Sequence, residues 1–235
     1  PFKKVMARVH KVIADIAPHD SIERYTNLGV DVVKGYGKLL DPWTVEIKLN
    51  DGGTQTLTAR TIVIATGARP FVPPLPGIEE TGYVTSDTLW TKFAELEEAP
   101  KKLVVLGGGP IGCELAQSFA RLGSSVTQIE MSERIMIKED LEVSTFAHEA
   151  LIESGVNILT SHQALRCEAR DGKKFIVVKH NDTEIDIEYD ELLCAVGRSA
   201  RLKGYGLEEL GIETNRTVVT NEYLETLYPN IFAAG

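Results

Sequence analysis

The chain has 235 residues, of which 43% are hydrophobic and 25% charged, a composition typical of a folded globular protein rather than a disordered one. Its formal net charge of -9 argues against a nucleic-acid partner, because phosphate backbones bind clustered basic residues. No run approaches the roughly 20 apolar residues of a membrane-spanning helix. The opening residues PFKKVMARVHKV do not resemble a secretion signal, so we expect a cytoplasmic protein.

The first quarter of the chain changes from helical to strand periodicity. Apolar residues recur at helical spacing over residues 2–16, and Ser21 is a candidate N-cap for a short second helix over residues 21–28. The apolar run Ile62–Ala65 predicts a strand covered on both faces, and the proline-rich residues 71–77 predict an extended linker. Between the second predicted helix and this apolar run, turn residues separate four strand-like segments, which predict a small antiparallel meander. The four segments are residues 30–34, 36–40, 43–49 and 54–58.

The middle of the chain alternates strands with helices. This alternation, with short connections, predicts right-handed parallel βαβ units. A second meander over residues 164–188 and a buried strand over residues 191–196 follow. The expected fold is therefore α/β, with two Rossmann-like layers that carry inserted antiparallel strands. The alternating elements are strands over 103–106, 126–130 and 156–159 and helices over 110–122 and 141–154.

A glycine-rich turn, GGGPIG, joins the first of these strands to its helix. In a GxGxxG turn of this kind, Gly107 permits the tight turn, Gly109 lets a pyrophosphate approach the backbone, and Gly112 lets the helix pack against the strand. The N-terminus of the helix adds unpaired N–H groups and a partial positive charge. The pattern predicts a dinucleotide site.

An acidic residue about 20 positions further on is the second part of this fingerprint, because it accepts hydrogen bonds from the adenosine ribose. Glu130 ends the next predicted strand and meets the requirement. Its carboxylate would repel a 2′-phosphate, so we expect NAD(H) rather than NADP(H). Arg134 lies nearby in the sequence and leaves NADP(H) open as the alternative.

The three cysteines, Cys113, Cys167 and Cys194, form no CxxC or metal-ligand spacing. Small side chains of this kind are commonly buried. We therefore expect structural thiols, no metal site and no reactive cysteine.

Four stretches resemble motifs of the pyridine nucleotide-disulfide oxidoreductase family, which includes dihydrolipoamide dehydrogenase and mercuric reductase. In chain order, TIVIATGARP resembles the family's ATG strand, GGGPIGCELA its NAD-site signature, CAVGRSAR its VGR motif and YPNIFAAG the beginning of its flavin motif. The resemblance runs over nearly the whole chain and favours the mercuric reductase-like branch.

The resemblance implies an FAD-dependent oxidoreductase that passes hydride from NAD(P)H to flavin and on to a disulfide or metal-ion acceptor. It implies Rossmann-like FAD- and NAD(P)-binding domains, each with a parallel sheet and an antiparallel meander, with the FAD domain incomplete. We expect a partial FAD-binding domain over residues 1–88, an NAD-binding domain over 89–210 and a return segment into the FAD domain over 211–235. The resemblance also implies a homodimer, and we expect self-association of this chain through the apolar stripe of its first helix.

The resemblance also assigns cofactor-binding residues. Glu114 would lie towards the nicotinamide carboxamide, Glu130 would bind the adenosine ribose and Arg198 would lie near the nicotinamide half. The backbone of Gly37, Ala65, Thr66 and Gly67 would contact FAD. The remaining residues implied along the nicotinamide cofactor are Gly107, Gly109, Ile111, Gly112, Ala195, Val196 and Gly197.

The chain departs from the family pattern in several ways. It contains neither the family's GxGxxG for FAD nor its CxxxxC redox pair, none of its five histidines matches the family's His-Glu motif, and its flavin motif stops at Gly235. We therefore expect a central fragment without catalytic residues, inactive by itself, with its histidines at the surface or structural. Two alternatives stay open: an NADH oxidase- or peroxidase-type flavoprotein with a single catalytic cysteine, and a flavin-independent NAD-binding module.

Overall fold

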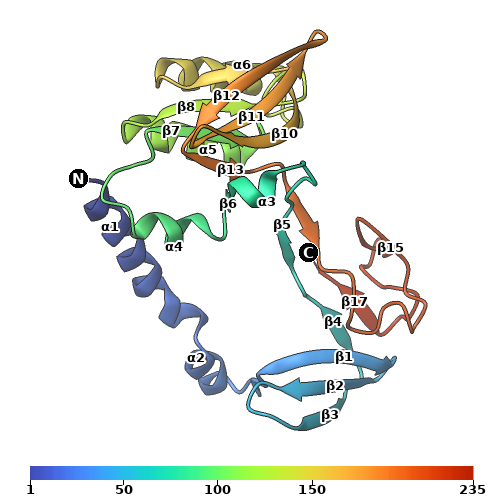
Figure 1. Ribbon diagram of the computed structural model, residues 1–235. Coiled ribbons are helices and arrows are strands. Elements are labelled where there is room, and N and C mark those ends of the chain that lie inside the picture. Colours follow the sequence, from blue (N-terminus) through green and yellow to red (C-terminus); the bar gives the residue numbers. More distant parts are fainter. Residues whose placement is uncertain (235) are drawn as a thin grey trace. The chain divides into compact units, whose positions relative to one another are not determined.

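The computed structural model describes residues 1–234, and the chain divides into two compact units. The first unit comprises residues 1–15 and 70–197, and the second comprises residues 16–69 and the residues from 198 onward. Figure 1 labels most of the elements of both units. Within the described residues, no helix combines the length and apolar character needed to cross a bilayer.

The first unit contains a five-stranded parallel sheet in the order β6-β13-β7-β8-β9, of which Figure 1 labels β6, β13, β7 and β8. Its helices are α1 (Phe2–Ile16), α3 (Ile78–Thr81), α4 (Leu89–Ala94), α5 (Pro110–Arg121) and α6 (Leu141–Glu153). Its strands are β6 (Val84–Thr85), β7 (Lys102–Leu106), β8 (Ser125–Ile129), β9 (Asn157–Leu159), β10 (Gln163–Arg170), β11 (Lys173–His180), β12 (Thr183–Tyr189) and β13 (Glu191–Cys194). The predicted alternation of strands and helices over this region is confirmed.

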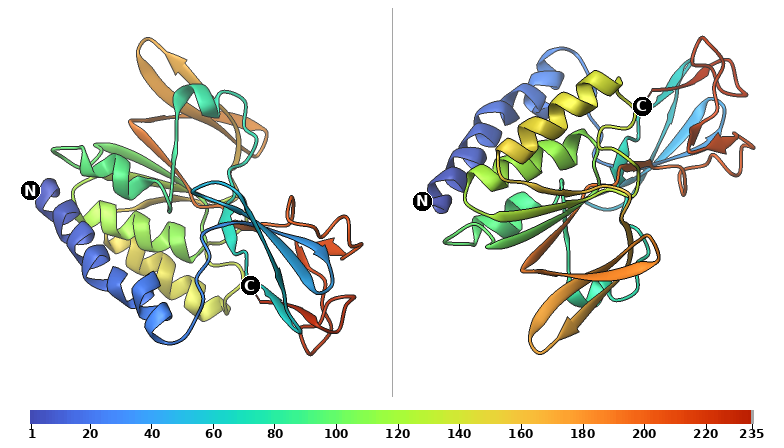
Figure 2. Two further views of the ribbon diagram at one scale, coloured as in Figure 1. Left: turned by 90° about the horizontal axis from the view of Figure 1, so that it is seen from below. Right: turned by 90° about the horizontal axis from the view of Figure 1, so that it is seen from above.

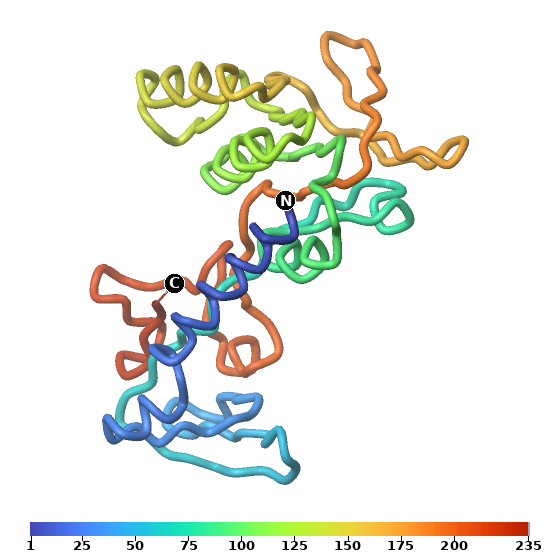
Figure 3. Tube along the Cα trace, turned by 90° about the vertical axis from the view of Figure 1, so that its left-hand side faces the viewer, coloured from blue at the N-terminus to red at the C-terminus, as the bar shows by residue number. Residues whose placement is uncertain are grey.

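Both faces of the parallel sheet are covered. Helices α1, α5 and α6 lie on one face and the β10–β12 meander on the other (Figure 2), and the orange meander extends away from the yellow α6 in Figure 3. The central strand β7 explains why: Leu103 and Val105 belong to the core on the helix side, whereas Val104 and Leu106 belong to the core on the meander side. Side chains alternate across a strand, so a run of four apolar residues supplies both cores.

The core on the helix side is built around aromatic contacts. Phe119 of α5 contacts Phe93 of α4 edge-on at 5.5 Å between ring centroids, and Phe2 of α1 at 6.2 Å. Met6 of α1 is buried in the same cluster, whereas Ile13 is half exposed. The first half of the apolar stripe on α1 is therefore covered within the first unit and is not free for the predicted self-association.

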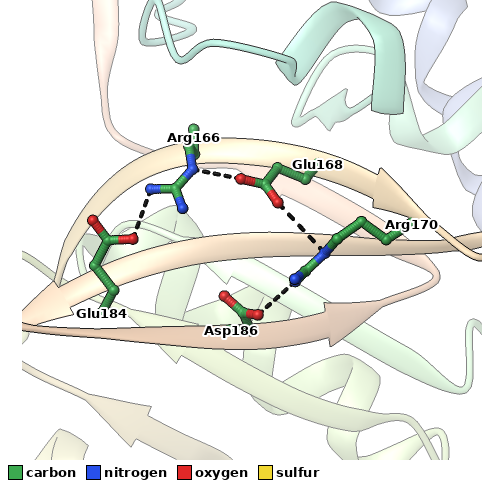
Figure 4. A network of polar contacts seen from close by, with 5 residues as sticks. All are labelled: Arg166, Glu168, Arg170, Glu184 and Asp186. Carbon is green, nitrogen blue, oxygen red and sulfur yellow. Dashed lines mark hydrogen bonds and ion pairs between the residues drawn. The ribbon is translucent and has the colours of Figure 1, made fainter.

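The outer surface of the meander carries a network of ion pairs (Figure 4). Arg166 contacts Glu168 at 2.5 Å and Glu184 at 2.8 Å, while Arg170 contacts Glu168 at 3.4 Å and Asp186 at 2.5 Å. The period-two spacing along β10 and β12 places these residues on one surface of the meander. Both guanidinium groups are therefore paired with carboxylates of the same surface.

The second unit consists of small sheets. β1, β2 and β3 form an antiparallel meander, and β17 pairs in parallel with β4, so that Ile231 lies opposite Ile62. Its elements are η1 (Ala17–Asp20), α2 (Ile22–Asn27), β1 (Gly35–Asp41), β2 (Thr44–Leu49), β3 (Thr54–Thr58), β4 (Ile62–Ile64), β5 (Ala68–Pro70), β14 (Arg198–Ala200), β15 (Thr214–Asn215), β16 (Thr217–Val218) and β17 (Ile231–Ala233).

Two sequence predictions for this unit are wrong, whereas the N-cap and three of the four predicted meander strands are confirmed. Residues 30–34 form no strand, and Val30 and Val32 are exposed, because their alternation meets no pairing partner in the described part of the chain. The run Ile62–Ala65 is not covered on both faces, since Val63 is 59% exposed. The predicted N-cap is present: the Ser21 hydroxyl accepts a hydrogen bond from the Arg24 amide at 3.2 Å.

The aromatic core predicts a large stability difference between two phenylalanines of the first unit. Phe93 is 1% exposed and Phe146 on α6 is 73% exposed. We expect Phe93→Ala to lower the free energy of unfolding by about 3–5 kcal/mol, the usual cost of emptying a buried aromatic site. Phe146→Ala should change it by less than about 0.5 kcal/mol.

The measurement is urea unfolding followed by the fluorescence of Trp90, the tryptophan of the first unit, in a Trp43→Phe background that removes the signal of the second unit. Equal effects of the two substitutions would contradict the assigned core.

Candidate functional site

A cavity of about 690 Å³ opens in the first unit at the carboxyl edge of the parallel sheet. Parallel strands end at the same edge, which is where open α/β sheets bind their ligands. The segments that follow β7, β8, β9 and β13 all contribute to its lining. The predicted site residues that line this cavity are Gly107, Gly109, Ile111, Glu130, Ala195, Val196 and Gly197.

The backbone of the glycine turn is tightly packed on one side and open on the other. Gly107 has a φ of 114°, and a Cβ there would overlap the Ala195 carbonyl. A Cβ on Gly112 would overlap the Gly107 carbonyl oxygen. Gly109, in contrast, has nothing within 4 Å of the position of a Cβ. Gly107 and Gly112 are thus required by packing, and Gly109 leaves space beside the backbone for a ligand.

Contacts from beneath hold the turn in place. The side chain of the buried Gln128 donates a hydrogen bond from Nε2 to the Gly107 carbonyl at 3.0 Å. The Met136 amide donates to the Gly108 carbonyl at 2.7 Å. The carbonyl groups of the turn are therefore occupied on the protein side.

The Glu130 carboxylate is fixed against this turn. Its Oε2 accepts from the Gly108 amide at 2.6 Å, and its Oε1 accepts from the Ser132 amide at 2.7 Å. A carboxylate has about four lone-pair positions, so both oxygens keep capacity for ligand hydroxyl groups. An open backbone at Gly109, the N-terminus of α5 and a fixed carboxylate on one cavity fit the pyrophosphate and ribose of an adenine dinucleotide.

The Arg134 side chain stabilises the loop that carries it. Its guanidinium donates hydrogen bonds to the carbonyls of Met136, Ile137 and Glu139 at 3.1, 3.0 and 3.1 Å. Arg134 is absent from the cavity lining, whereas Lys138 is part of it.

Three predicted residues do not line the cavity. Gly112 is buried beneath it, and Glu114 is exposed on α5. Arg198 belongs to the second unit, where its Nη2 donates to the Ala68 carbonyl at 2.9 Å. The expected roles of Glu114 and Arg198 beside the nicotinamide stay predictions.

The residues expected to contact FAD lie in the second unit. The Thr66 hydroxyl lies 3.2 Å from the Arg201 carbonyl and 3.2 Å from the Tyr205 hydroxyl, and Gly67 has a φ of 68° with open space at its Cβ position. Ala65, Thr66 and Gly67 are exposed, as close approach of a ligand to their backbone requires. A Cβ on Gly37 would only reach ordinary contact with Val45, so packing does not require glycine there.

Part of the cavity lining was not predicted from the sequence. Phe71, Pro73 and Leu75 come from the proline-rich segment that was expected to be only a linker. His162, expected to be merely a surface or structural residue, also lines the cavity. Its position in the chain was a signal that could have identified it, because His162 lies just after β9, as Glu130 lies just after the neighbouring strand β8.

The three cysteines are buried and unpaired. Burial raises the pKa of each thiol, and it raises that of Cys194, which is 1% exposed, to about 12. The folded protein therefore keeps these thiols protonated at pH 8. The described residues contain no group of three or more side chains suited to hold a metal ion.

The packing of the turn predicts opposite outcomes for two glycine substitutions. Gly112→Ala forces a methyl group against a backbone carbonyl, and we expect a loss of about 3 kcal/mol in the free energy of unfolding of the first unit. Gly109→Ala places its methyl group in open space, and we expect a change below about 0.5 kcal/mol. Urea unfolding followed by Trp90 fluorescence measures both. A tolerated Gly112→Ala would show that the turn is looser than described.

The raised thiol pKa values predict slow labelling of the folded chain. With Ellman's reagent at pH 8 we expect no rapid reaction of the native protein and reaction of all three cysteines in urea. Rapid labelling of one native cysteine would contradict this assignment.

The raised thiol pKa values also predict that the free energy of unfolding falls as the pH rises above about 9, because the unfolded thiols then lose protons that the folded thiols retain.

Comparison with known proteins agrees with the geometry. Mercuric reductase from Staphylococcus aureus is 37% identical over 218 residues, covering 92% of this chain and 38% of the relative. Dihydrolipoamide dehydrogenase from Chaetomium thermophilum is 39% identical over 216 residues, covering 88% of this chain and 41% of the relative. The chain thus spans about 40% of the length of these relatives.

A solved structure gives the same result for the fold. The Cu(II) complex of the HOCl-induced flavoprotein disulfide reductase RclA from Escherichia coli superposes with a TM-score of 0.84 at 28% identity, covering 100% of this chain and 52% of that chain. The family described as pyridine nucleotide-disulphide oxidoreductase matches residues 2–235. The chain belongs to the pyridine nucleotide-disulphide oxidoreductase family.

Proposed function

We propose that the first unit is the nicotinamide-dinucleotide site of an oxidoreductase that passes hydride from NAD(P)H to flavin and on to a disulfide or metal-ion acceptor. The observation that carries the proposal is the Glu130 carboxylate, fixed at 2.6 Å from the Gly108 amide on the cavity beside the glycine turn. The similarity to mercuric reductases and to a protein named as a flavoprotein disulfide reductase supports the flavin step and the two classes of acceptor.

Each part of the cavity has a separate task in this proposal. The N-terminus of α5 and the open backbone at Gly109 bind the pyrophosphate. Glu130 accepts hydrogen bonds from the adenosine ribose. Residues 195–197, which follow β13 on the other side of β7, contact the nicotinamide half, with Glu114 and Arg198 as further candidates.

When bound, the two cofactors would supply the chemistry, a hydride transfer from the dinucleotide to the flavin. The chain's own residues bind, orient and shield the rings. In the second unit, Gly37, Ala65, Thr66 and Gly67 are the candidates for backbone contacts to FAD, and the exposed backbone of residues 65–67 supports that assignment.

NAD(H) is the proposed dinucleotide rather than NADP(H). The Glu130 carboxylate would face the 2′ position, where a phosphate would meet a like charge. Arg134 cannot offset this repulsion without giving up its hydrogen bonds to three backbone carbonyls. Lys138 is the remaining cation to test, because it lines the cavity and is exposed.

The proposal predicts that Glu130→Gln weakens NADH binding at least about tenfold, since a hydrogen bond to a charged acceptor contributes about 1.5–3 kcal/mol. Isothermal titration calorimetry of the 235-residue chain with NADH measures the dissociation constant. Glu133→Gln is the matched control, because Glu133 is exposed on the same loop and does not line the cavity. Unchanged NADH binding by Glu130→Gln would overturn the assigned ribose contact.

The same titration with NADPH tests the preference for NAD(H). We expect NADPH to bind the wild type at least about tenfold more weakly than NADH, because one such repulsion at a partly buried site costs about 1.4 kcal/mol or more. Lys138→Ala should leave the ratio of the two dissociation constants unchanged. The contrary result has two parts: the wild type binds NADPH as tightly as NADH, and Lys138→Ala weakens the binding of NADPH but not of NADH. That result would assign the 2′-phosphate contact to Lys138 instead.

A further inference from the structure

The order of strands in the first unit places His162 beyond the ribose end of the cavity. In the sheet order β13-β7-β8-β9, the glycine turn follows β7, Glu130 follows β8, and His162 lies just after β9. Neighbouring strands are about 4.8 Å apart. A dinucleotide with its pyrophosphate at the turn and its ribose at Glu130 therefore carries its base towards the segment that follows β9. This step rests on the proposed function.

His162 is held at that place by both its backbone and its ring. Its amide donates to the Glu130 carbonyl at 3.0 Å, and the preceding amide, of Ser161, donates to the Ser132 carbonyl at 2.8 Å. Its ring stacks on the ring of His180 with 4.3 Å between centroids and 7° between planes. The loop that carries Glu130 and the loop that carries His162 are thus linked directly.

The hydrogen bonds of the two rings assign their protons. Nδ1 of His162 lies 2.6 Å from the Thr160 carbonyl, which can only accept, so Nδ1 carries the proton and Nε2 of the neutral ring is an acceptor. In His180, Nδ1 lies 3.0 Å from the Ser161 carbonyl, and Nε2 lies 2.8 Å from the Asn181 side-chain amide. His180 therefore uses both of its ring nitrogens.

Nε2 of His162 is the one ring nitrogen of this pair that has no hydrogen-bond partner within the described residues 1–234. The residue is 9% exposed and lines the cavity. A ring nitrogen without a protein partner on a residue that lines a cavity is available as an acceptor for a donor on the occupant of that cavity.

We propose that His162 is a specificity-determining residue that accepts a hydrogen bond from the 6-amino group of the adenine ring of the dinucleotide. Adenine carries an N–H donor at this position, whereas a 6-oxo purine such as hypoxanthine carries an acceptor. Two acceptors facing one another form no hydrogen bond, so the site discriminates between the two bases.

The test compares NADH with its reduced hypoxanthine analogue on the 235-residue chain, by isothermal titration calorimetry at pH 8. We expect the wild type to bind NADH about tenfold more tightly than the analogue, the effect of one hydrogen bond. The ratio of the two dissociation constants is measured on the wild type, without any substitution. A wild-type ratio near one overturns the assignment while leaving the dinucleotide site intact, and failure to bind either compound overturns both proposals.

Substitution then assigns the discrimination to His162. His162→Phe keeps a flat ring for the stack on His180 and removes the acceptor, so we expect the ratio to fall towards one. His162→Gln, whose amide both accepts and donates, should lower the ratio as well and serves if the phenylalanine variant does not fold. His148→Gln on α6 is the control, because His148 lies outside the cavity lining. Variants of His162 that retain the wild-type ratio would overturn the proposal.

Discussion

The close approach of backbone to backbone at the glycine turn is the constraint on which the first unit depends. The Gly107 carbonyl meets the Cα of Gly112 and the side-chain amide of Gln128, and Gly107 itself lies against the Ala195 carbonyl. These contacts join the ends of β7 and β13 to the start of α5. The Gly108 amide also donates a hydrogen bond to the carboxylate of Glu130, which follows β8, so the end of β8 is connected to the turn as well. One turn thereby fixes the positions of four elements around the cavity.

The parts of this fold that could be predicted from sequence are those encoded by local pattern. The apolar run of β7, the glycine turn and the helix that follows it depend on residues close together in the chain. By contrast, β6 has two residues and α4 has six and no side-chain N-cap, so neither leaves a periodic signal. Their positions come from tertiary packing, in which Val84, Leu89 and Phe93 fill the core on the helix side.

The candidate site likewise contains residues that could be predicted from a local motif and residues that could not. Gly107, Glu130 and Val196 were predictable because each belongs to a motif at the end of a strand. His162 could have been found from its position just after β9, whereas the apolar side chains of residues 71–75 reach the cavity only through the folding of the proline-rich segment, which no short pattern encodes. The wrongly predicted strand over residues 30–34 shows the reverse case, in which an alternating pattern lacked a pairing partner.

The most direct test of the account is an amide NMR titration of the 15N-labelled chain with NADH. The central claim is that the dinucleotide lies across the carboxyl edge of the sheet, from residues 195–197 through the glycine turn and Glu130 to His162. We expect the largest shifts at the amides of Gly108, Gly109, Ser132 and His162, with those of the exposed meander face around Arg170 unmoved. Shifts confined to the second unit, or none at saturating NADH, would contradict the account.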